Sequence, residues 1–183
     1  MNKKIEKSFE ELGSTDDKIR MAALQHLLKI TDSPVDWVYE VWDRLHEKLD
    51  HENSYQRSIA VMLLSNLAKG DVENRLAKSL DRIFIHTRDD KFITSRQCIQ
   101  NIWKVAATNR SNREKVLGHL EKRFSECADE KHYNLLRQDI LQSMLCLSRF
   151  EGSSDLLPKA QALIAKEQDS KYRKQYEALL KTN

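Results

Sequence analysis

The sequence predicts an all-α protein in which about five helix pairs stack into a solenoid. The first observation is composition: of 183 residues, 40% are hydrophobic and 32% charged, with only four glycines and two prolines, as in helix-rich soluble proteins. The second is a stretch with two acids, an arginine and spaced apolar residues, DDKIRMAALQHLLKI, which has four further relatives along the chain. Helix pairs that cannot bury their apolar stripes alone are expected to stack around one continuous core.

The recurring stretch predicts one helix in each repeat, here called the B helix. Its arginines are 37, 39, 41 and 36 residues apart, a spacing typical of helical repeats. Apolar residues follow each arginine three and seven positions later, so an apolar stripe runs down each helix. The B helices are expected at residues 15–30, 53–69, 90–110, 130–150 and 170–181, with the arginines Arg20, Arg57, Arg96, Arg137 and Arg173.

A second helix, the A helix, is expected before each B helix, at residues 3–12, 35–50, 72–87, 112–127 and 155–167. Each of these segments places its apolar residues on one face. Gly13, Gly70 and Gly152 fall just past expected helix ends, where a left-handed residue is favoured. Together the helices define one domain, 1–183, with repeats at about 3–30, 35–69, 72–108, 112–150 and 155–181.

The sequence lacks the signals of secretion and of membrane insertion. Its start, MNKKIEKSFEEL, is charged and amphipathic, and no segment approaches the roughly 18 apolar residues of a membrane span. We therefore expect a cytoplasmic protein that makes no membrane contact. Cys98, Cys127 and Cys146 are widely spaced without a C-x-x-C motif, which favours reduced thiols over disulfides or metal ligands.

The best candidate for metal chemistry is the stretch HEKLDHE, with two His-Glu pairs at His46, Glu47, His51 and Glu52. A step of five residues rotates a side chain by about 140° around a helix, so the two pairs would not share a face. A solvated surface is the better interpretation. No H-E-x-x-H motif and no glycine-rich phosphate loop occur either, so we predict no catalytic residue, no metal, no cofactor and no small-molecule substrate.

Charge is distributed unevenly between the two sets of helices. The B segments hold 16 basic and 6 acidic residues, a net charge of +10, which leaves −7 for the rest of the chain. The exposed B positions are otherwise amides and basic residues, which can hydrogen-bond an extended acidic peptide or follow phosphates. The expected binding residues are Gln25, Lys29, Asn66, Lys69, Gln97, Gln100, Asn101, Lys104, Gln142 and Arg149.

The pattern of acid-containing turn, arginine and A-x-x-x-L spacing resembles the HEAT repeat of the armadillo-like α-α superhelices. DDKIRMAALQHLL and NSYQRSIAVMLLSNL are the most typical copies, and the resemblance covers essentially the whole chain. It implies a right-handed superhelix with A helices on the convex side and B helices lining the concave side. It also implies a ladder of acid–arginine contacts between repeats, formed by Asp17, Arg20, Asp50, Arg57, Asp90, Arg96, Asp129, Arg137, Asp169 and Arg173.

These features favour a non-catalytic scaffold that binds a protein partner, preferably through an acidic segment, on its concave B-helix surface. Two alternatives stay open. HEAT-like alkylpurine DNA glycosylases use concave tryptophans and an aspartate, so Trp103 and Asp139 are the residues to inspect for a DNA-binding repair protein. The chain could also be a folding unit of a larger assembly, with Tyr172 and Tyr176 uncovered on its last helix.

Overall fold

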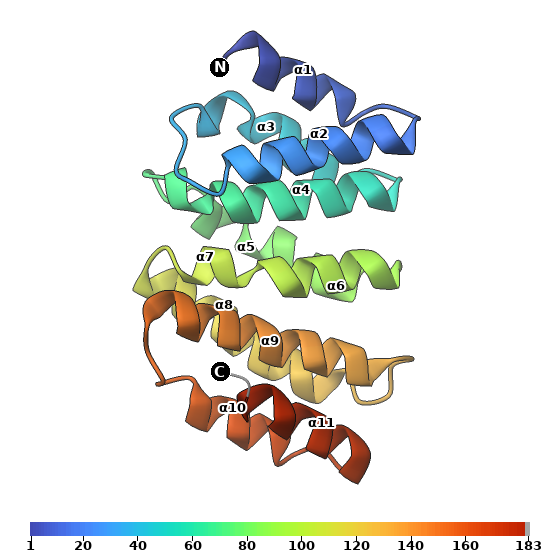
Figure 1. Ribbon diagram of the computed structural model, residues 1–183, viewed down its shortest axis with the longest axis vertical. Helices are drawn as coiled ribbons and strands as arrows, with labels where there is room; N and C mark the ends of the chain where they lie inside the picture. Colours follow the sequence, from blue (N-terminus) through green and yellow to red (C-terminus); the bar gives the residue numbers. More distant parts are fainter. Residues whose placement is uncertain (182–183) are drawn as a thin grey trace. The chain divides into compact units, whose positions relative to one another are not determined.

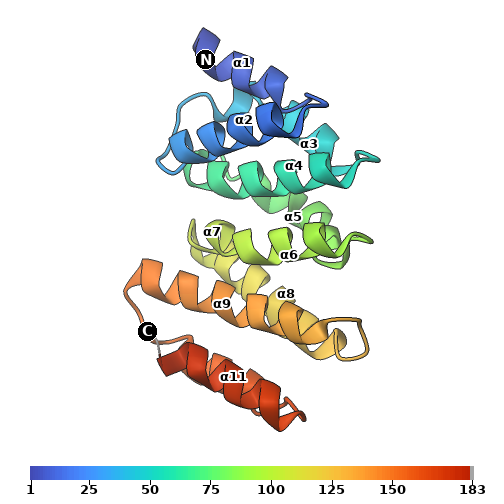
Figure 2. The same ribbon diagram turned by 45° about the vertical axis from the view of Figure 1, so that its right-hand side comes forward.

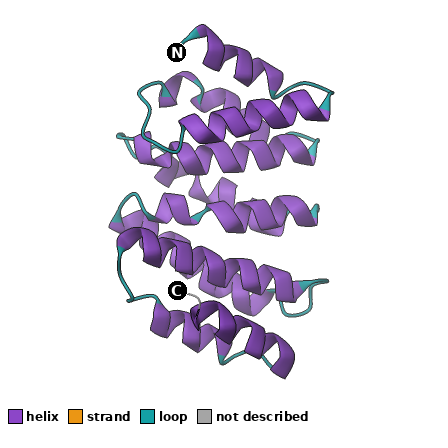
Figure 3. Ribbon diagram, in the orientation of Figure 1, coloured by secondary structure: helices purple, strands orange, loops and turns teal. Residues whose placement is uncertain are grey.

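The computed structural model describes residues 1–181, and every regular element in that range is a helix (Figures 1 and 3). The all-α prediction is therefore confirmed. The chain divides into two compact units, residues 1–101 and the residues from Ile102 onward, and each is described by itself. Among the described helices, none is long and apolar enough to cross a membrane.

The first unit contains three successive helix pairs. Its A helices are α1 (Lys3–Glu11), α3 (Trp42–Leu49) and α5 (Leu76–Ile85), and its B helices are α2 (Asp17–Ile30), α4 (Ser54–Leu67) and α6 (Phe92–Asn101). Three short 3-10 helices accompany them, namely η1 (Val38–Glu40), η2 (Ala68–Gly70) and η3 (His86–Arg88). Because α4 packs against α2, α3 and α6, the three B helices form one layer with α4 at its centre (Figures 1 and 2).

Side-chain caps fix where the first two B helices begin. Asp16 Oδ1 accepts the backbone N–H of Lys18 at 2.8 Å, and Asn53 Oδ1 accepts that of Tyr55 at 2.9 Å. Such caps satisfy amide groups that have no partner inside the helix. They also place Arg20 and Arg57 about one turn into α2 and α4, where their side chains reach the preceding turns.

The segment before α3 is folded more tightly than the expected helix 35–50. The α-helix begins only at Trp42, after the 3-10 turn η1. Gly70 lies against this turn, where an added Cβ would stand 2.7 Å from Val38 Cγ2 and 2.9 Å from the Val35 carbonyl oxygen. Close approach, not a left-handed φ, therefore requires glycine here. Of the three glycines expected to be left-handed, only Gly152 is, with φ +63°.

The second unit contains α7 (Trp103–Ala106), α8 (Arg110–Glu126), α9 (Tyr133–Glu151), α10 (Leu157–Ile164) and α11 (Ser170–Lys181). The long helix α9 packs against all four others. Tyr176 of α11 is fully buried, and its hydroxyl donates to the Asn134 carbonyl at 2.9 Å. Tyr172 is half-buried against Tyr133, with ring centroids 5.9 Å apart. The expectation that both tyrosines are uncovered is wrong, because α9 provides the cover.

The division between the units falls inside the expected B helix 90–110. There the helix stops at Asn101 and restarts at Trp103. The Asn101 side-chain amide donates to the Gln97 carbonyl at 2.8 Å. A side chain that bonds the carbonyl one turn back competes with the helical backbone and bends it.

Candidate interaction surface

Arg57 links two successive helix pairs of the first unit. From α4, its Nε and Nη2 donate to the two carboxylate oxygens of Asp89 at 2.7 Å each, and Nη2 also reaches Asp90 at 2.7 Å. Its Nη1 donates to the carbonyls of His51 and Glu52, both at 2.9 Å. A two-pronged arginine–carboxylate pair fixes relative orientation as well as distance. Asp89, rather than the expected Asp90, is the main partner.

This pair also determines the ionisation of Asp89. Burial favours its protonated form, but hydrogen bonds from Arg57, the Lys91 amide and His86 outweigh that effect and hold the pKa of Asp89 well below its usual value. His86 Nδ1 lies 3.2 Å from the same carboxylate. Asp89 is therefore a charged structural group, held by Arg57, His86 and the Lys91 amide.

Arg137 does the same for the second unit with a different acid. Its Nη1 donates to Glu167 Oε2 at 2.7 Å, and its Nε to the Phe124 carbonyl at 3.0 Å. The guanidinium lies over the rings of Phe124 and Tyr133, 4.7 and 5.0 Å from their centroids. Glu167, in the turn before α11, was not among the expected ladder residues.

The other expected ladder residues have different partners. Arg20 donates to Asp17 of its own helix and to the Ser14 carbonyl, and Asp50 accepts from Arg82 at 2.6 Å. In the second unit Asp169 caps α11 by accepting the Lys171 amide at 2.8 Å, while Arg173 donates to the Glu167 carbonyl at 3.0 Å. Arg96 lies over the Phe92 ring, and Asp129 is exposed.

A hollow of about 270 Å³, here called the apolar hollow, opens on the B layer of the first unit. Three apolar side chains around it are well exposed: Met21 of α2 (54%), Tyr55 of α4 (60%) and Ile93 of α6 (61%). Contiguous exposed apolar surface on a soluble protein marks an interaction site. The full lining is Asp17, Arg20, Met21, Leu24, Tyr55, Ser58, Ile59, Met62, Ile93 and Gln97.

The binding residues expected in the first unit differ in how exposed they are. Gln97 lines the apolar hollow, and Gln25 and Lys29 are exposed on α2. Asn66 is buried, contrary to expectation, because its amide donates to the Leu28 carbonyl and the Thr31 hydroxyl at 3.1 and 3.2 Å. Lys69 donates to the Asp32 carbonyl, while Gln100 and Asn101 are half-buried on α6.

The three binding residues expected in the second unit also differ in exposure. Lys104 is half-buried, with its ammonium 6.0 Å from the Trp103 ring centroid. Gln142 is half-buried and donates to Cys146 Sγ at 3.6 Å. Arg149 is exposed near the end of α9.

Sequence reasoning missed the apolar lining residues of the hollow that are not buried, Met21, Tyr55, Met62 and Ile93. Met21 follows Arg20 by one residue. Tyr55 lies two residues before Arg57 and Met62 five residues after it, and Ile93 lies three residues before Arg96. At about 100° per residue these offsets fall within one sector of roughly 100° on the B helices. The signal was therefore present: apolar residues on the stripe that was expected to be polar.

The candidate metal ligands of HEKLDHE are separated by the fold. His46 is buried, with Nδ1 3.0 Å from the Trp42 carbonyl and Nε2 2.9 Å from the Ser79 hydroxyl. Burial lowers the pKa of His46, so the neutral ring is favoured. His51 is exposed and accepts the Asn53 amide at 2.9 Å. Within residues 1–181 no group of three His, Cys, Asp or Glu residues is arranged to hold a metal ion.

The residues named for the DNA repair alternative lie in the second unit. Trp103 is half-buried and packs against the exposed Phe150, with ring centroids 5.9 Å apart. Asp139 is buried. That alternative requires an exposed carboxylate beside an aromatic ring, and Asp139 does not meet this requirement.

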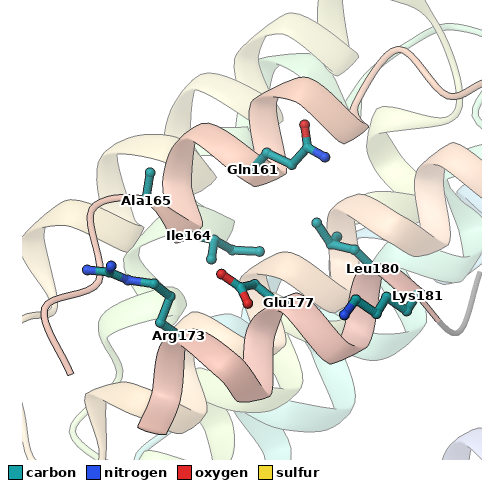
Figure 4. A pocket seen from close by; sticks show the side chains of 7 residues that line it. All are labelled: Gln161, Ile164, Ala165, Arg173, Glu177, Leu180 and Lys181. Atoms are coloured by element: carbon teal, nitrogen blue, oxygen red, sulfur yellow. The ribbon is translucent and has the colours of Figure 1, made fainter. Parts of the chain in front are cut away.

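A larger hollow of about 600 Å³ lies between α10 and α11 (Figure 4). Ile164 and Leu180 form its apolar part, whereas Arg173, Glu177 and Lys181 stand at four-residue spacing on α11. Alternating charges at this spacing are typical of a solvated helix face. The exposed apolar set of the first unit is therefore the stronger candidate surface.

Comparison with known proteins concerns the fold alone. No family model matches the chain, and no curated protein matches it. Two crystal structures of engineered proteins from the Northeast Structural Genomics Consortium are similar to it. The first has a TM-score of 0.56 and 22% sequence identity, and the match covers 94% of this chain and 77% of that one. The second has a TM-score of 0.54 and 16% sequence identity, and the match covers 96% of this chain and 77% of that one.

Proposed function

We propose that this chain is a non-catalytic interaction module of the HEAT-like class, with five helix pairs in a right-handed superhelix whose B helices bind a protein partner. The observation that carries the proposal is the exposed apolar set Met21, Tyr55 and Ile93 around the apolar hollow. Fully burying one such side chain is worth about 1.5–3 kcal/mol. Since Met21, Tyr55 and Ile93 are 54–61% exposed, a partner that covers all three gains about half of that amount for each.

Charge beside the hollow supports an acidic partner. Lys18, Gln25 and Lys29 are exposed along one face of α2, next to Met21. Neither lysine makes a salt bridge within residues 1–181. Acidic residues in a partner would complement these charges and speed its association.

The test is affinity capture from a lysate of the source organism, with Ile93→Asp and a matched control, Ile85→Asp. Both isoleucines are strongly exposed in the first unit, at 61% and 67%, but only Ile93 lines the apolar hollow. We expect specific proteins to bind the unmodified chain and Ile85→Asp but not Ile93→Asp, because a carboxylate would be desolvated in the interface.

Nuclease treatment separates a nucleic acid partner from a protein partner. Capture that persists after nuclease supports the proposal, and capture that disappears supports the DNA-binding alternative. DNA binding would also weaken with salt, the logarithm of affinity falling by about 0.9 per phosphate contact for each decade. Equal capture by all three baits would contradict a role for the apolar hollow.

A further inference from the structure

A second hollow adjoins the apolar hollow at the start of α2 and α4. This edge hollow measures about 400 Å³ and shares Asp17, Arg20 and Tyr55 with the apolar hollow. Since the two hollows have a common wall, one bound segment can occupy both. The rest of its lining is Gly13, Ser14, Thr15, Lys48, His51, Asn53 and Gln56.

The lining of the edge hollow is richer in basic than in acidic groups. It includes Arg20, Lys48 and His51 but only one acid, Asp17. Arg20 is already occupied by Asp17 and a backbone carbonyl. His51 Nδ1 accepts a backbone N–H, so its neutral ring carries the proton on Nε2 and can donate from there.

Among the cations that line the edge hollow, Lys48 has no carboxylate partner in the part of the chain that the structure describes. It is half-buried and makes no salt bridge within residues 1–181, and its ammonium donates to the Gln56 side-chain oxygen at 2.5 Å. Burial lowers the pKa of Lys48, and the nearby Arg44 lowers it further. An ammonium has three donors, so two remain for a ligand.

We propose that the partner segment carries a Glu or Asp close to a bulky apolar residue. The apolar side chain fills the apolar hollow, and the carboxylate binds Lys48 and His51 in the edge hollow. Because the two hollows share Asp17, Arg20 and Tyr55, the two side chains lie close together in one segment. The inference rests on the proposed function and names the chemistry of its partner. Glu10 and Glu47 line a third hollow, which shares Gly13, Lys48 and His51 with the edge hollow; neither acid makes a salt bridge with Lys48 within residues 1–181.

The test is selection of random twelve-residue peptides displayed on phage, using the full chain as bait. The variant baits are Lys48→Met, Lys48→Arg, Ile93→Asp and the control Lys78→Met, since Lys78 is exposed on α5 outside both hollows. We expect the unmodified chain to enrich peptides with a bulky apolar residue and an acid at fixed spacing. Lys48→Met should keep the apolar preference and lose the acidic one, whereas Lys48→Arg and Lys78→Met should keep both.

A synthetic consensus peptide then gives the size of the effect. Its affinity should fall about tenfold with Lys48→Met, since a charge-assisted hydrogen bond is lost, and the same peptide with Glu replaced by Gln should bind both proteins equally. Thermal unfolding controls for folding: Lys48→Met loses the hydrogen bond to the buried Gln56, so it should unfold somewhat earlier than the unmodified chain, and affinities are compared at a temperature where both are folded.

The outcomes distinguish this inference from the proposed function. Apolar enrichment without an acid preference, or an acid preference unchanged by Lys48→Met, overturns the inference and leaves the proposed function standing. If the unmodified chain enriches no peptide beyond those enriched by Ile93→Asp, both are overturned.

Discussion

Arg57 and Arg137, one in each unit, each pair with a buried carboxylate of the following helix pair, Arg57 through two nitrogens and Arg137 through one. The side chains of Arg57 and Asp89 are 13% and 4% exposed, and Arg57 has a second acid, Asp90, at the surface. Those of Arg137 and Glu167 are 7% and 1% exposed, with aromatic rings beside the guanidinium. One repeated arginine can therefore link helix pairs through acids of different length at different turn positions, with a buried carboxylate in both of these cases.

The largest effect is expected from Glu167→Gln, which leaves the Arg137 charge buried without its counter-ion. Breaking a buried pair by removing one partner costs about 3–5 kcal/mol. Urea unfolding should show this loss. A loss below about 1 kcal/mol would mean that the pair contributes little.

The double change Arg137→Met with Glu167→Leu shows where that cost comes from. Replacing a buried ion pair by apolar residues is often neutral or stabilising. We expect the double variant to regain most of the stability lost by Glu167→Gln. If it remains as unstable as the single variant, the pair is needed for its geometry and not only for charge balance.

Asp89→Asn should cost less, about 2 kcal/mol, as for a charge-assisted hydrogen bond. Arg57 keeps two backbone carbonyls and Asp90 as acceptors. Because the pKa of Asp89 is lower in the folded chain than its usual value near 3.8, its stabilisation is present above that pH and lost as the pH falls below it. Acid titration of unfolding should therefore show a shallower loss below about pH 4 in Asp89→Asn. An unchanged slope would contradict the pairing.

The smallest effect is expected from Asp90→Asn, under about 0.5 kcal/mol, because exposed ion pairs contribute little. The Asp90 side chain is 69% exposed. Thermal unfolding of Asp89→Asn and Asp90→Asn under identical conditions gives the contrast directly. Equal losses would show that the two acids share the arginine evenly.

The sequence predicted the helices better than the contacts between them. Periodic apolar residues placed four of the expected B helices near their observed ranges, as at α4 (Ser54–Leu67) against the expected 53–69, whereas the expected 90–110 is broken into α6 and α7. The acid partners were harder to predict, since Asp89 and Glu167 lie seven and six residues before the next repeat's arginine. The loop conformation decides which acid of a turn reaches the arginine of the preceding helix pair, and the periodic pattern of the sequence does not predict that conformation.

The candidate surface was predicted only in part for a similar reason. Gln97, expected in a polar binding surface, lines the apolar hollow, but Asn66 was taken as exposed because its position on α4 was judged without its neighbour. The end of α2 covers it and supplies its two acceptors. Met21 and Ile93 were passed over because a polar lining was expected, although their helical offsets were available in the sequence.

Gly70 gives a practical criterion for recognising relatives of this chain. A Cβ at residue 70 would lie only 2.7 Å from Val38 Cγ2 and 2.9 Å from the Val35 carbonyl oxygen. Glycine at this position therefore lets the two turns pack in direct contact. A homologue with any side chain there must hold the Val35–Val38 turn farther out, which would shift the start of its second A helix. Genomic sequences could be sorted by this one position into chains that share the tight turn and chains that have rebuilt it.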